Sequence, residues 1–234
     1  MPVELYHLIA FLISVTVVLW TIPDVKTVGL KFGIVDRPNA RKIHKDPVVR
    51  VGGVSIFAGT IVALLIVWRL GAFTTIPASK QLEVGSMICG SILFFCIGFA
   101  DDLLSLTPIS RLIMQITVAS GCWLTGVKID FLSVPFDGLI HLSWLSLPIT
   151  VIWLVGMANA INWIDGVDGL AAGVSGIAAV VMLIVTLFMK QPAAALIAAS
   201  LAGAALGFLR YNFNPAQIFM GDGGAYFMGF TLAG

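Results

Sequence analysis

Runs of apolar residues, each about long enough to cross a bilayer, follow one another through nearly the whole 234-residue chain. A helix needs roughly 20 consecutive apolar residues to span the hydrocarbon core of a membrane. Only 11% of the residues are charged and the mean hydropathy is +1.03, whereas soluble domains contain about 25% charged residues. The sequence therefore predicts an all-α fold, a polytopic transmembrane helical bundle.

The apolar runs predict about seven complete spans followed by the beginning of an eighth. The eighth run starts near Ala225 and reaches Gly234, so we expect the chain to be C-terminally truncated. No low-complexity linker divides the sequence, and residues 1–234 are expected to form a single membrane-embedded domain. The predicted complete spans cover residues 3–22, 51–70, 85–100, 111–127, 141–158, 170–189 and 193–210.

The distribution of Lys and Arg predicts how the bundle is oriented. Odd-numbered loops contain nine of these residues, seven of them in the first loop (residues 23–50), and even-numbered loops contain four. Because cytoplasmic loops carry the excess of positive charge, we expect the N-terminus outside the cell and the odd-numbered loops in the cytoplasm. A net charge of +1 argues against nucleic acid as a partner, since that requires a basic surface.

Aspartates concentrate where the predicted spans end. An ionised Asp near hydrocarbon costs roughly 2.5–3.5 kcal/mol, so such groups rarely lack a function. These aspartates all lie in or next to odd-numbered loops, which we expect on the cytoplasmic side. Acidic clusters there suggest a divalent cation, or a phosphate held through one. They occur as Asp101-Asp102, as Asn159-Ala-Ile-Asn162-Trp-Ile-Asp165-Gly-Val-Asp168, and as Gly221-Asp222-Gly-Gly.

Each of these motifs also has a purely structural interpretation. Asp101-Asp102 could cap or anchor a helix end, since acidic residues are common at helix starts. Asn159 and Asn162 share a helix face and could form interhelical hydrogen bonds. The glycine-flanked aspartates could belong to simple turns. The first loop could owe its charge to orientation alone, although Arg50 beside two glycines is suited to a phosphate.

The order of the motifs is more specific than any one of them. Asp36-Arg-Pro-Asn and Arg50-Val-Gly-Gly precede Asp101-Asp102, then Asn159-x-x-Asn-x-x-Asp-Gly-x-Asp-Gly-Leu, then Phe219-Met-Gly-Asp-Gly-Gly. This series resembles the polyprenyl-phosphate N-acetylhexosamine-1-phosphate transferase family, from about residue 29 onward. The first loop resembles the bacterial branch that uses undecaprenyl phosphate and UDP-GlcNAc. Two departures are that Ala225 replaces the usual Ser, and that the family's later loop, rich in His and Arg, would lie beyond Gly234.

The resemblance implies a Mg²⁺-dependent enzyme, with Mn²⁺ as an alternative ion. It would transfer GlcNAc-1-phosphate from UDP-GlcNAc to undecaprenyl (polyprenyl) phosphate and release UMP. The lipid-linked sugar would initiate synthesis of a cell-surface polysaccharide at the bacterial cytoplasmic membrane, with the active site facing the cytoplasm.

The resemblance also implies roles for individual residues. Asp101 would accept or orient the proton of the lipid phosphate with support from Asp102, and Phe219 would stack on uracil. The implied catalytic residues are Asp101, Asp102, Asp165 and Asp168; the implied substrate-binding residues are Arg50, Arg111, Asn159, Asn212 and Phe219; the implied metal ligands are Asp222 and Asn162.

Other interpretations remain open. The same chemistry could use another UDP-N-acetylhexosamine, including UDP-MurNAc-pentapeptide. A cation-coupled transporter could use the aspartates to bind Na⁺ or protons, although transporter sites lie near the bilayer midplane and these aspartates lie at one side. A catalytically inactive scaffold is a third interpretation. The sequence does not decide whether the chain forms a homodimer.

Overall fold

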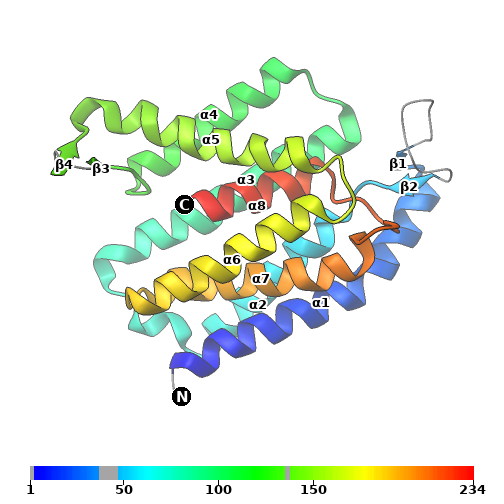
Figure 1. Ribbon diagram of the computed structural model, residues 1–234, viewed down its shortest axis with the longest axis horizontal. Helices are drawn as coiled ribbons and strands as arrows, with labels where there is room; N and C mark the ends of the chain where they lie inside the picture. The colour runs from blue at the N-terminus through cyan, green and yellow to red at the C-terminus, as the bar shows by residue number, and fades with distance from the viewer. Residues whose placement is uncertain (1–2, 37–46, 135–137) are drawn as a thin grey trace.

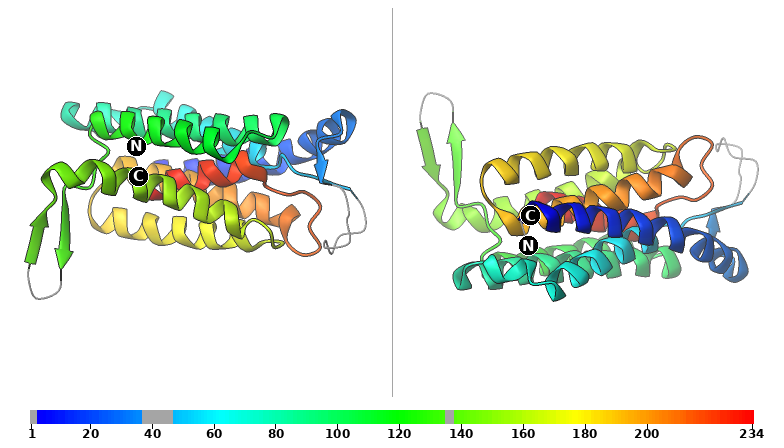
Figure 2. Two further views of the ribbon diagram at one scale, coloured as in Figure 1. Left: turned by 90° about the horizontal axis from the view of Figure 1, so that it is seen from above. Right: turned by 90° about the horizontal axis from the view of Figure 1, so that it is seen from below.

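Helices make up most of the chain in the computed structural model, which describes residues 3–36, 47–134 and 138–234 (Figure 1). They run roughly alongside one another as an elongated bundle, and Figure 2 shows the bundle from above and from below. The helices within the described residues are α1 (Val3–Phe32), α2 (Gly53–Arg69), α3 (Ala78–Leu104), α4 (Pro108–Leu124), α5 (Ser146–Ile164), α6 (Leu170–Phe188), α7 (Pro192–Asn212) and α8 (Gly221–Ala233), with short 3-10 turns η1 (Ala72–Thr75) and η2 (Ser143–Leu145).

Every predicted span coincides with one of these helices, which confirms the all-α, polytopic membrane architecture. Helices α1, α3, α5, α6 and α7 are long and apolar enough to cross a membrane, and α2 is a shorter apolar helix. Helix α4 has 17 residues and α8 has 13, fewer than the roughly 20 needed to cross the hydrocarbon core perpendicularly.

Two helix boundaries that lie beside prolines differ from the prediction. Helix α1 continues from residue 22 to Phe32 and contains Pro23. Proline removes one backbone donor, but the helix retains its other hydrogen bonds, and the Thr27 hydroxyl donates to the Pro23 carbonyl at 2.9 Å. Helix α3 begins at Ala78 rather than at residue 85, because Pro77 occupies the N-cap position and its fixed φ suits a helix start.

Two short antiparallel hairpins interrupt the helical pattern, and the sequence did not predict them. Strand β3 (Phe131–Val134) pairs with β4 (Gly138–His141), so the fifth helix begins at Ser146 rather than at the predicted residue 141. Strand β1 (Val35–Asp36) pairs with β2 (Val48–Val49), and Val49 also forms a parallel bridge with Ile218. The second hairpin thereby fixes the first loop against the segment that leads into α8.

Helix α8 lies at the centre of the bundle. It packs against α3 and α5 and also contacts α2 and α6, as Figure 1 shows. Most of its residues from Gly221 to Thr231 are buried. On α3, a Cβ atom at Gly98 would overlap the backbone of Asp222 and Gly223, so only glycine lets the start of α8 approach this closely.

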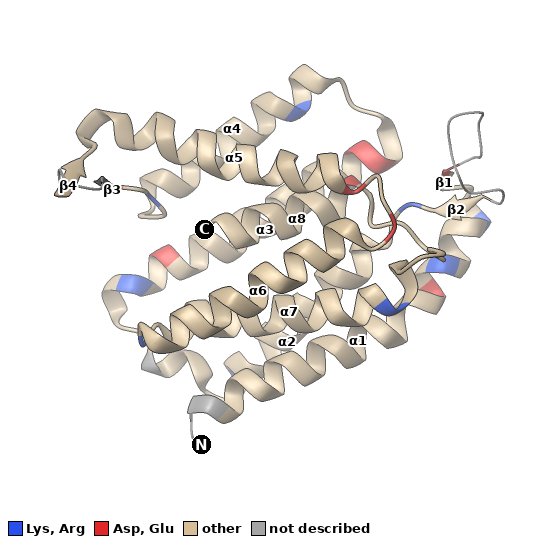
Figure 3. Ribbon diagram, viewed as in Figure 1, with Lys and Arg blue, Asp and Glu red and all other residues tan. Residues whose placement is uncertain are grey.

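The two ends of the bundle carry the charged residues, as Figure 3 shows. Asp101 and Asp102 are in the last turn of α3, Asp165 is the C-cap of α5, and Asp222 is in the first turn of α8. Neighbouring helices of the bundle thus bring their acidic ends together at the end where β1 and β2 lie.

Candidate active site

Asp222 is the point at which three helices meet. One carboxylate oxygen, Oδ1, accepts a hydrogen bond from Asn162 Nδ2 on α5 at 2.8 Å. The other, Oδ2, accepts one from Arg111 Nη1 on α4 at 3.3 Å. The Asp222 side chain is 18% exposed, so it is reachable from outside the bundle while both its oxygens face other side chains.

Asp102 holds the backbone at the start of α8. Its Oδ1 accepts from the backbone N–H of Asp222 at 3.1 Å, and its Oδ2 accepts from that of Gly223 at 3.0 Å. Arg50 Nη2 lies 3.0 Å from Oδ1, and the Asp102 side chain is only 1% exposed. A carboxylate at a helix N-terminus satisfies donors that have no partner within the helix. Asp102 therefore orients the turn that carries Asp222.

Gly221 permits this arrangement. Its φ of +75° is favourable only for glycine, and a Cβ there would collide with the carbonyl oxygen of Arg50 and lie 2.8 Å from Asp102 Oδ2. The glycine before Asp222 is thus required by backbone conformation and by space.

Asp101 is the neighbour of Asp102, but its contacts differ. It forms an ion pair with Arg111, whose Nη1 also contacts Asp222, so one guanidinium bridges the two carboxylates. The Asp101 side chain is 7% exposed. Two like charges beside each other repel and favour a cation between them. In the structure Arg111 supplies that positive charge.

Asp165 joins the same cluster from α5. Its Oδ2 accepts a hydrogen bond from the backbone N–H of Gly221 at 3.2 Å. Burial raises the pKa of Asp165 to about 8, the negative charges of Asp222 and Asp102 add to this effect, and the Gly221 hydrogen bond opposes it. A carboxyl group in this setting retains its proton near neutral pH unless a cation is bound nearby.

Asp168 and Asn212 lie apart from this cluster and shape the loop that precedes it. Asp168 Oδ2 accepts from Asn214 Nδ2 at 3.1 Å and from the backbone N–H of Ala216 at 2.9 Å. Asn212 Oδ1 accepts from the Gly169 N–H at 3.1 Å, and its Nδ2 donates to the Ile218 carbonyl at 2.9 Å. Both side chains thus connect the α5–α6 loop to the α7–α8 loop.

The other predicted site residues occupy the edges of the cluster. Arg50 follows β2 and reaches Asp102, as described above. Phe219, three residues before Asp222, is held through its backbone, which donates to the Val49 carbonyl at 2.8 Å and accepts from the Gly52 N–H at 2.9 Å. Asn159 lies about one helical turn before Asn162, directed at α4 rather than at Asp222. Within the predicted first-loop motif, Arg37 to His44 lie outside the described residues.

Two buried polar residues near the cluster were missed. Gln115 is 1% exposed, and its Oε1 accepts from Asn159 Nδ2 at 2.8 Å, which ties α4 to α5. Tyr226, on α8, is also 1% exposed and lies within electrostatic reach of Arg111 and Asp222. Gln115 follows Arg111 by four residues and therefore shares its helix face, which is the signal that could have identified it. Tyr226 similarly follows Asp222 by four.

The donors around Asp222 suit a magnesium ion that is shared with a substrate. Among the residues described, no three His, Cys, Asp or Glu side chains form a group that could hold a metal by themselves. Mg²⁺ commonly binds through one or two carboxylates and completes its shell with water and substrate phosphates. Asp222 provides carboxylate oxygens, and Asn162, which donates to one of them through Nδ2, also has an amide oxygen that a metal can bind.

The fold and the cluster define a polytopic membrane protein with a carboxylate-rich site at one end. Residues 84–234 match the model of a family described as glycosyl transferase family 4. The chain belongs to this family, as its motifs predicted.

The chain is also similar in sequence to individual transferases, over most of its own length. The chain is 37% identical to the probable undecaprenyl-phosphate N-acetylglucosaminyl 1-phosphate transferase of Bacillus subtilis, over 96% of the chain and 61% of that protein. It is 32% identical to the decaprenyl-phosphate N-acetylglucosaminephosphotransferase of Mycolicibacterium smegmatis, over 89% of the chain and 54% of that protein. It is 31% identical to the phospho-N-acetylmuramoyl-pentapeptide-transferase of Listeria welshimeri, over 96% of the chain and 71% of that protein.

Proposed function

We propose that this protein transfers GlcNAc-1-phosphate from UDP-GlcNAc to a polyprenyl phosphate and releases UMP. The observation that carries the proposal is the meeting of Asp101, Arg111, Asn162 and Asp222 from four helices at one end of a membrane bundle. Carboxylates and a guanidinium at a membrane edge suit a cation-bound diphosphate on one substrate and a lipid phosphate on the other. The names of the Bacillus and Mycolicibacterium relatives support this choice of sugar and lipid.

The proposed reaction is a direct phosphoryl transfer. An oxygen of the lipid phosphate attacks the β-phosphorus of UDP-GlcNAc, a new P–O bond forms, and the bond from that phosphorus to the UMP oxygen breaks. Catalysis of such a transfer consists mainly of positioning and charge neutralisation. Asp101 would accept the proton of a singly ionised lipid phosphate or orient that phosphate, and Arg111, which contacts Asp101, would then be free to meet phosphate oxygens.

Asp222 and Asn162 would hold Mg²⁺ together with the diphosphate of the donor, and Mn²⁺ would be an alternative ion. When bound, the ion would neutralise the charge that develops on the leaving phosphate. Arg50 would meet phosphate at the opposite edge, where it contacts Asp102 and is 38% exposed.

The nucleotide would bind beside the two loops that Asp168 and Asn212 connect. Phe219, held by its backbone between the first loop and α8, would stack on uracil. In this proposal Asp165 forms part of the wall of the nucleotide pocket. Asp168 and Asn212 would position the nucleotide indirectly, because they hold the two loops beside it. Asn159 would hold α5 against α4 through its hydrogen bond to Gln115.

We place the site on the cytoplasmic side of a bacterial cytoplasmic membrane, with the N-terminus outside, because the loops on the side of the site carry the excess of Lys and Arg. The product, a lipid-linked sugar, would initiate a cell-surface polysaccharide.

Release of UMP from UDP-GlcNAc by the purified protein, measured with and without polyprenyl phosphate and Mg²⁺, tests the proposal. Release that requires both additions is the expected result. UDP-MurNAc-pentapeptide serves as the second donor, because the Listeria relative carries that specificity in its name. Turnover of the pentapeptide donor alone would reassign the donor, and no release with either donor would remove the proposed activity.

A further inference from the structure

The β3–β4 hairpin lies at the end of the bundle opposite to the carboxylate cluster (Figure 1). Both views in Figure 2 show that it extends sideways, across the direction in which the helices run. In the described part of the chain, the two strands pack mainly against each other rather than against a helix. The bundle therefore does not cover the faces of this hairpin.

Both faces of the hairpin carry exposed apolar side chains. Residues paired across antiparallel strands share a face, and successive residues on one strand point to opposite faces. The register places Phe131 and Leu139 on one face, and it places Leu132 and Ile140 on the other. Their exposed fractions are 55%, 60%, 43% and 47%, in that order. An isolated hairpin is only marginally stable in water, and apolar surface on both faces makes water a poorer environment still.

Hydrogen bonds hold the base of the hairpin to the bundle and so fix its sideways direction. The Leu142 N–H donates to the Asp130 carbonyl at 2.9 Å, and the Ser146 hydroxyl donates to Asp130 Oδ1 at 3.3 Å. The Ile129 N–H donates to the Thr150 hydroxyl oxygen at 2.9 Å. Ser146 and Thr150 both belong to α5, which is long and apolar enough to span a membrane. The hairpin is thus attached firmly to a spanning helix.

Three tryptophans lie at the same end of the bundle as the hairpin. Trp68 is in the last turn of α2, Trp123 is in the last turn of α4, and Trp144 is in η2. Trp68 is 55% exposed and Trp144 is 79% exposed. Trp123 Nε1 donates to the hydroxyl of Ser146 at the hairpin base, at 2.9 Å. Because tryptophan is enriched where a bilayer meets water, the hairpin begins at the level of a bilayer boundary.

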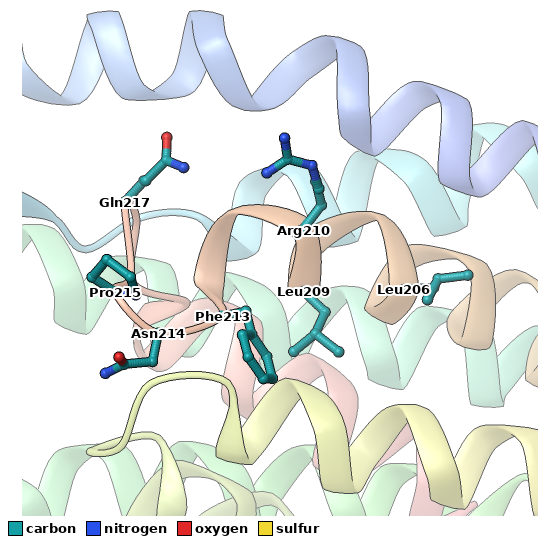
Figure 4. Close-up of a pocket in the computed structure, with 7 residues that line it drawn as sticks. All are labelled: Leu206, Leu209, Arg210, Phe213, Asn214, Pro215 and Gln217. Carbon is teal, nitrogen blue, oxygen red and sulfur yellow. The ribbon is translucent and has the colours of Figure 1, made fainter.

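Exposed apolar side chains at the other end of the bundle have a neighbour within the protein. In Figure 4, Leu209 and Phe213 point from α7 toward α6. A Cβ atom added at Gly169, the N-cap of α6, would lie 3.4 Å from the Phe213 ring and 3.5 Å from Leu209. These side chains line the pocket beside the loops assigned above to the nucleotide. The hairpin has no comparable neighbour in the described part of the chain.

The composition and the edges of the hairpin indicate the depth at which it lies. Neither strand contains Lys, Arg, Asp or Glu, and Lys128 at the base is paired with Asp130 at 3.3 Å. The strands therefore offer apolar surface rather than a charge for a particular headgroup. The outer edges of two paired strands leave backbone N–H and C=O groups that hydrocarbon cannot satisfy, so they need the polar boundary of a bilayer.

We propose that the β3–β4 hairpin is immersed in the boundary between headgroups and acyl chains, in the leaflet opposite to the proposed active site, with lipid on both faces. Apolar side chains at such a boundary stabilise the position of a protein in the membrane. Contact with a second copy of the chain would cover one face and leave the other exposed, whereas lipid covers both. The proposal does not depend on the reaction proposed above.

Nitroxide spin labels on opposite faces of the hairpin test this proposal in the purified protein, reconstituted in phosphatidylcholine vesicles. The labels are attached to Leu139→Cys and, separately, to Ile140→Cys, with Cys89, Cys96 and Cys122 replaced by Ala. Oxygen concentrates in lipid, whereas a water-soluble nickel chelate does not. At both positions, the logarithm of the ratio of oxygen collisions to chelate collisions should be positive.

Lys80→Cys is the matched control, because Lys80 is an exposed, charged residue in the first turn of α3, at the same end of the bundle. There the logarithm should be negative. A negative value at either hairpin position, or equal values at the hairpin and at Lys80→Cys, would overturn the proposal. So would protection of a hairpin label from both reagents, which would show that protein covers it. Broadening of the spectrum that disappears on dilution with unlabelled protein would assign the hairpin to a contact between copies, which also contradicts the proposal.

Discussion

Two neighbouring regions of the site hold their carboxylates in different ways. Around α4 and α8, Asp101 and Asp222 are held mainly by the side chains of Arg111 and Asn162, and the Leu106 backbone also contacts Asp101. In the loop before α6, Asp165 and Asp168 accept hydrogen bonds from the backbone N–H groups of Gly221 and Ala216.

This difference indicates which carboxylates take part in the reaction and which support the structure of the site. Side-chain partners can swing away when a cation or phosphate arrives, whereas backbone partners are fixed by the fold. Two adjacent residues show both types, because Asp102 accepts from two backbone N–H groups at the start of α8, whereas Asp101 meets that helix through the Asp222 side chain. We therefore assign the reacting and metal-binding roles to the first region and a supporting role to the second.

Asp222→Ala should have the largest effect on turnover. The substitution removes the carboxylate that both Asn162 and Arg111 contact, and losing one preorganised electrostatic group typically lowers the rate about 10²–10³-fold. Initial rates of UMP release at limiting Mg²⁺ provide the measurement. Activity like that of the wild type would remove Asp222 as the metal ligand.

The two adjacent aspartates should respond differently to Asn substitution. Asp101→Asn should lower turnover about 10²-fold or more with little change in donor affinity, because its ion-pair partner, Arg111, has a side chain that can reorient. Asp102→Asn should lower the thermal denaturation temperature as well, since an amide offers only one oxygen to the two backbone donors. Turnover, donor affinity and denaturation temperature are measured for both. Equal profiles would contradict the division between the regions.

Asp165 should make the stability of the metal-free protein depend on pH. Its pKa is about 8 in the folded protein against an ordinary value of 3.8, so over this interval the folded state retains a proton that the unfolded state has lost. Stability should fall as the pH rises from about 4 to about 8 and level off above that. Denaturation temperatures in chelator-treated detergent solution, compared with those of Asp165→Asn, check this. A slope that the variant leaves unchanged would refute the assignment.

Asp168→Asn should have the smallest effect. Its Oδ2 accepts from Asn214 and Ala216, and an amide oxygen can replace it for the backbone donor. We expect less than about a tenfold loss of turnover and a loss of stability of roughly 1 kcal/mol. A turnover defect as large as that of Asp222→Ala would place Asp168 in the chemistry.

The sequence predicted the bundle and the end at which its acidic residues meet, because apolar length and loop parity are encoded locally. It did not predict that Asp168 and Asn212 hold loops rather than face Asp222. Their partners, Ala216 and Gly169, are backbone donors more than 40 positions away along the chain. Such partners become visible only when the loops are placed.

Two other features were hidden for related physical reasons. Pro23 favoured an early end to α1, but one missing hydrogen bond did not outweigh the packing of that helix against α7 and α2. In the sequence Gln115 is a single polar residue within a predicted span, and its role depends on Asn159 of the neighbouring helix. The length of α1 and the role of Gln115 both depend on tertiary contacts rather than on the local sequence.

The central claim is that residues of α3, α5 and α8 meet around one cation, which Asn162 and Asp222 would hold. Fe²⁺ in place of Mg²⁺, with peroxide and ascorbate, generates radicals that cleave the backbone near the bound ion, since oxygen ligands also accept iron. The account predicts cleavage near residues 101, 162 and 222 in the same protein, suppressed by excess Mg²⁺ and abolished in Asp222→Ala. Cleavage confined to one of these segments, or unaffected by Asp222→Ala, would contradict it.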